Sequence, residues 1–166
     1  LKVDVSLIFT TSPNQQTGDA NIKSFGPLFT TDELQDEVVK KAHLNRLLTF
    51  ENFAVSSTNQ LAFAAAQTVA QKLTTSYNPL FIYGGVGVGK THLMQAIGNA
   101  VLSKKPKTRM IYCMGEEFTN EIIFAIRNRT TRDFKDKFRN TQLLLIDDVQ
   151  FIAGKAGTQE EFMHPQ

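Results

Sequence analysis

The chain has 166 residues, of which 42% are hydrophobic and 20% are charged, a composition typical of one soluble globular domain. No window reaches the roughly 18 consecutive apolar residues of a membrane-spanning helix, so an integral membrane segment is not expected. Cys113 is the only cysteine. A single cysteine excludes an intramolecular disulfide and a zinc finger, and we expect a reducing compartment, the cytoplasm.

The formal net charge of +2 hides a basic middle segment. Residues 45–115 contain 7 Lys or Arg against 1 Asp or Glu. Such a segment suits an anionic partner. A solvated basic surface without a partner explains the same pattern, so charge alone does not decide the function.

The first quarter of the chain has two kinds of sequence. Residues 1–10 alternate as a strand does, with apolar side chains at Val3, Val5, Leu7 and Phe9. Residues 11–26 are rich in Ser, Pro, Asn, Gln, Thr and Gly, which is typical of a linker, and residues 32–44 favour a short helix. We expect residues 1–43 to be a poorly ordered linker or the end of a preceding domain.

Residues 59–103 predict a helix, a strand, a tight turn and a second helix. Strong helix formers fill residues 59–73, and we expect the inward face to carry Leu61, Ala65 and Val69. The apolar run at residues 80–83 predicts a strand that is buried on both faces. A glycine-rich turn follows, then a helix over residues 90–103 with inward side chains at Leu93, Ile97 and Val101.

The remaining pattern completes an α/β fold with a parallel sheet. Residues 109–114 predict a second strand, which closes a β-α-β unit. Helices are expected over residues 116–128 and from residue 130 or 131 to 138. Residues 143–146 predict a third buried strand, which ends in two acids.

The turn after the first buried strand fits the phosphate-loop pattern G-x-x-x-x-G-K-[ST]. Glycines let consecutive backbone N–H groups converge on one point, and the positive end of the following helix faces the same point. Lysine then supplies a positive charge to the β- and γ-phosphates, and the hydroxyl of the next residue is placed to bind Mg²⁺. The residues of this pattern are Gly84, Gly85, Val86, Gly87, Val88, Gly89, Lys90 and Thr91.

A second Mg²⁺ contact is expected at the end of a neighbouring strand. Asp147 occupies that place, directly or through water, and Asp148 could orient or deprotonate an attacking water. A solvated acidic turn is the alternative for this pair. Lys90, Asp147 and Asp148 are thus the candidate catalytic residues, and Thr91 with Asp147 the candidate metal ligands.

With these motifs placed, the sequence resembles the ATPase domain of the bacterial chromosomal replication initiators, the DnaA family of AAA+ proteins. The resemblance covers residues 44–162 and extends well beyond the phosphate loop. It implies a P-loop NTPase of the AAA+ type with a three-layer parallel sheet, of which residues 44–166 would be the N-terminal part. The segments that carry it are residues 44–45, 49–53, 59–62, 77–83, 92–94, 145–151 and 158–162.

The resemblance implies an initiator that binds ATP, ADP and Mg²⁺, assembles on the origin of replication and opens duplex DNA. ATP and ADP would act as the switch, with weak hydrolysis as the reset. Self-association into a filament is implied, with the replicative helicase and acidic phospholipids as further candidate partners. An IstB-type or helicase-loader AAA+ ATPase and another P-loop NTPase, such as a kinase, remain the alternatives.

The family also implies residues for the base and for DNA. Phe50, Asn52 and Phe53 match the segment beside the adenine. Residues 116–139 match an insertion that touches single-stranded DNA, and its cations are interleaved with Phe134 and Phe138, as phosphates and stacked bases require. Phe118, Ile122 and Ile126 form a stripe that favours the core. The residues matched to DNA contacts are Ile123, for which ordinary packing is the alternative, Arg127, Arg129, Lys155 and Thr158.

Several features depart from the family. Ala156 and Gly157 replace an acidic residue and an arginine, which removes one DNA contact, and Ser56 replaces a glycine near the adenine. The chain begins with Leu and leaves the pattern near Pro165, so we expect a fragment without the later strands, sensor residues, arginine finger, lid and duplex-binding domain.

The family's sheet order, 5-1-4-3-2, would leave the strands at residues 80–83 and 143–146 without their common neighbour. We therefore expect marginal stability and negligible ATP hydrolysis from this chain.

Overall fold

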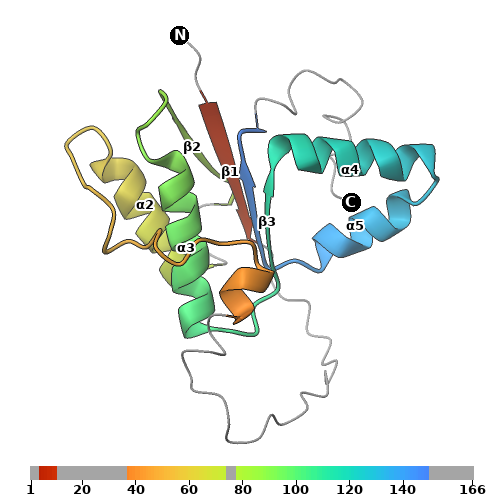
Figure 1. Ribbon diagram of the computed structural model, residues 1–166, viewed down its shortest axis with the longest axis horizontal. Helices are drawn as coiled ribbons and strands as arrows, with labels where there is room; N and C mark the ends of the chain where they lie inside the picture. The colour runs from red at the N-terminus through yellow and green to blue at the C-terminus, as the bar shows by residue number, and fades with distance from the viewer. Residues whose placement is uncertain (1–3, 11–36, 74–77, 150–166) are drawn as a thin grey trace, which may run out of the picture.

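The structure, a computed structural model, describes residues 4–10, 37–73 and 78–149. It has three layers: α2 and α3 lie on one side of a central sheet, and α4 and α5 lie on the other (Figure 1). The helices and strands predicted between residues 59 and 146 are confirmed within one or two residues at their ends, whereas the helix predicted over residues 32–44 is described only at residues 37–41. The elements are β1 (Asp4–Thr10), α2 (Gln60–Gln71), β2 (Leu80–Gly84), α3 (Lys90–Lys104), β3 (Met110–Met114), α4 (Gly115–Arg127), α5 (Thr131–Arg139) and β4 (Leu143–Asp147).

The sheet is mixed, whereas the sequence predicted a parallel sheet. Its strand order is β2-β1-β4-β3. β3 and β4 pair in parallel, and β1 pairs antiparallel with β2 on one side and with β4 on the other. It follows that β2, β4 and β3 share one direction, as expected, and β1 alone runs against them.

β1 occupies the place of the common neighbour that the sequence analysis expected to be missing. Residues 4–10 lie between β2 and β4, so the expectations of a linker there and of two unpaired strands are wrong. The buried backbone groups of β2 and β4 need hydrogen-bond partners, and β1 supplies them. The described buried side chain of β1 is Ile8, which lies outside the alternating apolar set that predicted the strand. Residues 37–41 form a short helix, and the rest of residues 1–36 lies outside the described chain.

The larger core lies between the sheet and the α2–α3 layer. Ile8 of β1 is fully buried in it. Leu93, Ile97 and Val101 of α3 face inward as predicted. The inward face of α2 was predicted only in part: Val69 is buried, but Leu61 is 84% exposed. The buried side chains of α2 are Ala66, Val69 and Ala70. Small residues at these positions let α2 approach α3 closely.

A smaller, aromatic core lies on the other face of the sheet. Phe118 of α4 packs there with Leu144 and Ile146 of β4. The rings of Phe134 and Phe138 on α5 close the cluster, but α5 has no fully buried residue. The helix pair is therefore attached to the sheet through a few large rings. None of the helices in the described ranges has the length and apolar character to span a bilayer.

Candidate nucleotide-binding site

The phosphate loop joins the end of β2 to the start of α3. Gly87 and Gly89 have φ angles of 80° and 91°, a conformation that a side chain disfavours. A Cβ atom at Gly89 would also lie 2.6 Å from the ring of Phe53. Val86 is 81% and Val88 is 44% exposed. The valine side chains thus turn outward, and the loop offers its backbone to a ligand.

Lys90, the first residue of α3, turns its side chain back into the loop. It is only 7% exposed, and its Nζ donates to the carbonyl oxygens of Gly84 at 3.2 Å and Gly85 at 2.7 Å. The ammonium therefore lies where the loop curls and the helix begins. Loop backbone, helix N-terminus and lysine together form an anion-binding arrangement.

Thr91 and Asp147 are brought together from 56 positions apart in the chain. The Thr91 hydroxyl donates to Oδ2 of Asp147 at 2.6 Å. Asp147 is 1% exposed at the end of β4, and its second oxygen, Oδ1, accepts the backbone N–H of Asp148 at 3.1 Å. A hydroxyl and a carboxylate are the oxygen ligands that Mg²⁺ prefers, so the donor set fits this ion.

Asp148 lies in a sharply turned part of the chain. Its φ is 53°, in the left-handed region. Its carbonyl oxygen lies close to Gly115, the first residue of α4, where a Cβ atom would come within 2.5 Å of it. Asp148 is half-buried, and this close approach fixes the start of α4 beside the end of β4.

A tyrosine extends the polar network behind Asp147. Tyr112 faces the same side of the sheet as Asp147, because the β3–β4 register pairs Met114 with Asp147. Gln95 Nε2 donates to the Tyr112 hydroxyl at 3.2 Å. Burial raises the pKa of Tyr112; the Gln95 hydrogen bond opposes this shift, and the carboxylates of Asp147 and Asp148 add to it.

The segment matched to the adenine side lies against the start of α3. Phe53 is stacked on Phe63 of α2, with ring centroids 5.6 Å apart, and meets His92 edge-on at 5.2 Å. Phe50 also packs edge-on against Phe63. Asn52 is exposed, and its Nδ2 donates to the carbonyl of Leu47, within its own loop.

Three polar side chains that the sequence analysis did not single out as site residues fasten this loop to α3. His92 Nε2 lies 2.7 Å from the carbonyl of Thr49, and Gln95 Oε1 accepts the N–H of Asn45 at 2.8 Å. Asn99 donates to two carbonyls of the same loop. Their spacing of three and four residues puts them on one face of an otherwise apolar helix. That polar stripe was the signal available in the sequence.

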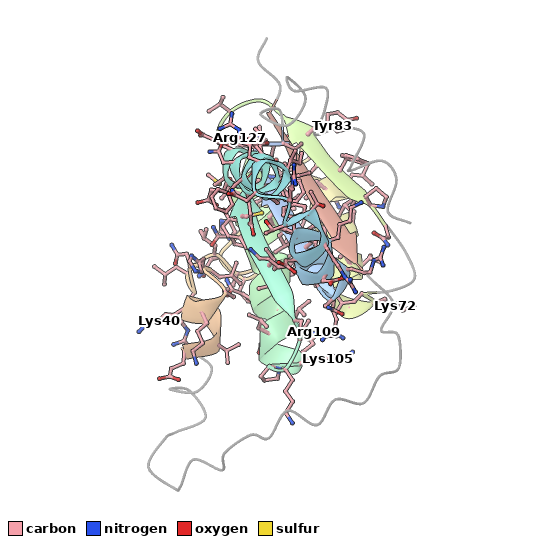
Figure 2. All side chains as sticks on the ribbon, turned by 90° about the vertical axis from the view of Figure 1, so that its right-hand side faces the viewer. Lys40, Lys72, Tyr83, Lys105, Arg109 and Arg127 are labelled. Atoms are coloured by element: carbon pink, nitrogen blue, oxygen red, sulfur yellow. The ribbon has the colours of Figure 1, made fainter. Side chains whose placement is uncertain are left out.

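The residues matched to DNA contacts lie on the opposite side of the sheet. Ile123 is half-buried on α4, and Arg127 and Arg129 are exposed at and just beyond its end. Figure 2 shows Arg127 near the same end of the molecule as Tyr83 of β2, with Lys105 and Arg109 at the far end. Lys155 and Thr158 lie outside the described residues.

The aromatic residues of the insertion are used for packing. Phe134 and Phe138 contact each other at 4.5 Å and Phe118 at 5.5 and 5.0 Å between centroids. The expectation that they interleave with cations for base stacking is therefore not met by these positions. Ile126 was predicted to belong to the core stripe, but its side chain is 50% exposed. Cys113 packs in β3, where burial raises its pKa to about 12.

The comparisons with known proteins agree with these motifs. Residues 44–165 match the family described as "Bacterial DnaA ATPAse domain". The chain is 47% identical over 156 residues to the chromosomal replication initiator protein DnaA of Herpetosiphon aurantiacus. That alignment covers 92% of this chain and 33% of the relative, so the chain spans about a third of the relative's length.

Solved structures give the same result. Domain III of the replication initiation protein DnaA from Thermotoga maritima is 40% identical, with a TM-score of 0.66 over 74% of this chain and 51% of that one. A replication initiator DnaA bound to AMPPCP and single-stranded DNA is 43% identical, with a TM-score of 0.67 over 74% and 38%. The chain described here thus belongs to the bacterial DnaA family and contains part of its AAA+ ATPase domain.

Proposed function

We propose that this chain is the nucleotide-binding portion of a chromosomal replication initiator, which binds ATP and ADP with Mg²⁺ and uses the nucleotide as a conformational switch. The observation that carries the proposal is the junction of Lys90, Thr91 and Asp147, with the hydroxyl 2.6 Å from the carboxylate. Lys90 and Thr91 begin α3 and Asp147 ends β4, so only the folded chain brings the three residues together. A structural neighbour with AMPPCP bound supports nucleotide as the ligand.

Each residue of this site has a proposed role that follows from its chemistry. The loop N–H groups and Lys90 bind phosphate, while Thr91 and Asp147 hold Mg²⁺, which would screen the phosphate charge. Phe53 supports the loop from behind Gly89, and the segment at residues 50–53 borders the base. Asp148 is the candidate to orient water, and we propose weak hydrolysis, if the whole protein supplies the remaining groups.

We further propose that α4 and α5 present a single-stranded DNA contact. Arg127 and Arg129 are exposed, and a neighbour in the same family is bound to single-stranded DNA. Ile123 contributes an apolar edge, and Lys155 and Thr158 remain candidate contacts. Cations at the tip of a helix pair can follow a phosphate backbone without blocking the nucleotide site.

At the level of the whole protein, the proposal is assembly on origin DNA and opening of the duplex in the cytoplasm. We propose that the whole protein also associates into a filament and binds the replicative helicase and acidic phospholipids. These partners are proposed for the whole protein, because this chain spans about a third of its relative's length. These partners follow from family membership alone.

Binding of a fluorescent ATP analogue with Mg²⁺ tests the nucleotide site. We expect saturable binding that Lys90→Ala weakens at least 100-fold, because the buried ammonium is the main cation of the site. Lys105→Ala is the matched control, since Lys105 is exposed at the far end of α3. Equal affinity of wild type and Lys90→Ala would reject the proposed site.

Fluorescence anisotropy with a labelled oligonucleotide tests the DNA contact in the presence of the same analogue. Arg127→Glu is expected to weaken binding of single-stranded DNA about tenfold and to make the affinity less dependent on salt concentration. Lys40→Glu, an equal charge change on an exposed residue elsewhere (Figure 2), should leave the affinity nearly unchanged. Equal losses in both variants would indicate net charge rather than a defined contact.

A further inference from the structure

β1 is the only strand that holds the phosphate-loop strand in the sheet, within the described residues. β2 is an edge strand, and its ladder runs to β1 alone, with Asp4–Ile8 facing Leu80–Gly84. The other side of β1 pairs with β4, where Leu7–Thr10 face Leu143–Ile146. Every strand-to-strand hydrogen bond between β2 and the rest of the sheet therefore passes through β1.

The two halves of the nucleotide site lie on the two sides of β1. β2 leads into the phosphate loop and Lys90, and β4 ends at Asp147. Neighbouring strands lie about 4.8 Å apart, so one inserted strand separates β2 from β4 by roughly 10 Å. Without β1, the sheet no longer fixes the distance and register between β2 and β4.

The side chain of Ile8 adds to this role. It is 0% exposed, and its register partners are Leu80 of β2 and Leu145 of β4. Ile8 belongs to the same core as Leu93 and Ile97 of α3, the helix that begins at Lys90. Withdrawal of β1 would leave a cavity beneath the helix that carries the lysine and threonine of the site.

β1 lies outside the connections that link the other strands. It runs antiparallel to its neighbours, and the connections β2–α3–β3 and β3–α4–α5–β4 do not include it. Between Thr10 and residue 37, where the described chain resumes, lie 26 residues. Dissociation of β1 therefore requires no rearrangement of the chain that links the other strands.

We propose that pairing of β1 between β2 and β4 assembles the nucleotide site, so that β1 pairing and nucleotide binding favour each other. This inference rests on the proposed nucleotide binding. Coupling of this kind is reciprocal: whatever factor β1 pairing adds to nucleotide affinity, nucleotide adds to β1 pairing. β1 acts as a positioning element, since none of its residues is among those proposed to bind phosphate or Mg²⁺.

A reversible covalent lock tests the coupling on the full chain. Val5 and Tyr83 are register partners, and antiparallel partners have Cα atoms about 4.5 or 5.5 Å apart, within the range that a disulfide spans. Tyr83 is 75% exposed, so its replacement by cysteine removes little packing, and the Val5→Cys, Tyr83→Cys double variant serves as its own control in the reduced state. Cys113 should not compete for the engineered pair, because it lies on β3, which β4 separates from β1 and β2 in the sheet.

We expect the oxidised double variant to bind the Mg²⁺–ATP analogue at least threefold more tightly than the same protein after reduction. The comparison is made within one variant, so folding differences between proteins do not enter. Equal affinity in the two redox states overturns the inference while leaving nucleotide binding intact. Absence of binding in every form, wild type included, overturns the proposed function and this inference with it.

A backbone variant tests the opposite direction. Ser6→Pro removes a ladder hydrogen bond from a strand that is paired on both sides, and Ser6→Ala keeps the N–H as its matched control. We expect at least a tenfold loss of nucleotide affinity in the proline variant alone. Circular dichroism then establishes that its helices remain.

Hydrogen exchange tests whether nucleotide protects β1 more than it protects the helix pair on the other face of the sheet. Saturating nucleotide should slow exchange of the β1 amides and of their β2 partners in wild type, with little change in α5. Nucleotide-independent exchange of β1 would contradict the coupling even if Ser6→Pro unfolds the chain.

Discussion

The two faces of the sheet are built differently. On one face, α2 and α3 bury a continuous aliphatic core, and the polar groups of α3 are tied to a neighbouring loop by hydrogen bonds. On the other, α4 and α5 rest on a cluster of phenylalanines, and their charged side chains face solvent. The first face holds the candidate phosphate and metal residues, and the second holds the candidate DNA residues.

This difference indicates how one small domain can carry two binding surfaces. A phosphate site requires fixed backbone positions, which a dense core supplies. A surface that follows a nucleic-acid backbone requires exposed cations on a support that tolerates movement. The two faces meet at Gly115, where the start of α4 approaches Asp148.

The largest expected effect on stability comes from the aromatic core beneath α4 and α5. Phe118→Ala should lower the free energy of unfolding by about 4 kcal/mol, because it removes the ring on which both α5 phenylalanines pack. Chemical denaturation measures the loss. Phe124→Ala, at a 65% exposed position of the same helix, should change it by less than about 0.5 kcal/mol. Similar losses in the two variants would contradict the assigned core.

A substitution at the junction should affect both faces. Gly115→Ala places a Cβ atom 2.5 Å from the carbonyl oxygen of Asp148, and relief of this overlap should cost about 2 kcal/mol. Thermal denaturation with and without Mg²⁺–nucleotide measures both consequences. Gly85→Ala is the stability control for the measurement without nucleotide, since no atom lies within 4 Å of its added Cβ. An unchanged melting temperature for Gly115→Ala would refute the close approach.

Tyr112→Phe should affect the nucleotide face by about 1 kcal/mol, because buried Gln95 loses its hydroxyl partner. The pH dependence sharpens this test. Since burial raises the pKa of Tyr112 above its ordinary value, its contribution to stability is complete below about pH 10 and declines as pH rises through the folded-state pKa. Denaturation midpoints from pH 8 to 11 should fall more steeply for wild type than for Tyr112→Phe.

The smallest effect belongs to the ion pair between Lys137 of α5 and Glu121 of α4. Both side chains are nearly half exposed, so Lys137→Gln should cost about 0.5 kcal/mol in low salt and almost nothing in 1 M NaCl. Denaturation at the two salt concentrations measures the difference. A loss above about 2 kcal/mol that survives high salt would mean that the pair, rather than the phenylalanines, holds α5.

Much of the nucleotide face could be predicted from local sequence. The glycine spacing requires a loop of the observed kind, and the apolar run at β4 correctly predicted a buried strand. The run at β2 wrongly predicted a strand buried on both faces: β2 is an edge strand, and its Phe81 and Tyr83 are 53% and 75% exposed. The meeting of Thr91 and Asp147 was predicted because parallel strands end at one edge of a sheet. The roles of His92, Gln95 and Asn99 were missed, because their partners are backbone carbonyls and amides of a distant loop, which carry no side-chain signature.

The helix-pair face was predicted less well for a related reason. The composition of the insertion favoured Phe134 and Phe138 as rings on which DNA bases stack. In the structure both rings pack against Phe118 instead, and the cations of α5 face solvent. Ile126 and Leu61 follow a regular helical period and are exposed all the same, since the period fixes the spacing along a face and not the rotation of that face toward the sheet.

The sequence by itself determined the phosphate loop, the acidic end of β4, the order of helices and strands, and membership of the DnaA family. These features depend on residues adjacent in the chain or at fixed spacing. Only the tertiary structure decided that residues 4–10 complete the sheet between β2 and β4. Strand pairing depends on which backbone groups remain unsatisfied in the folded chain, and no local pattern specifies the partner.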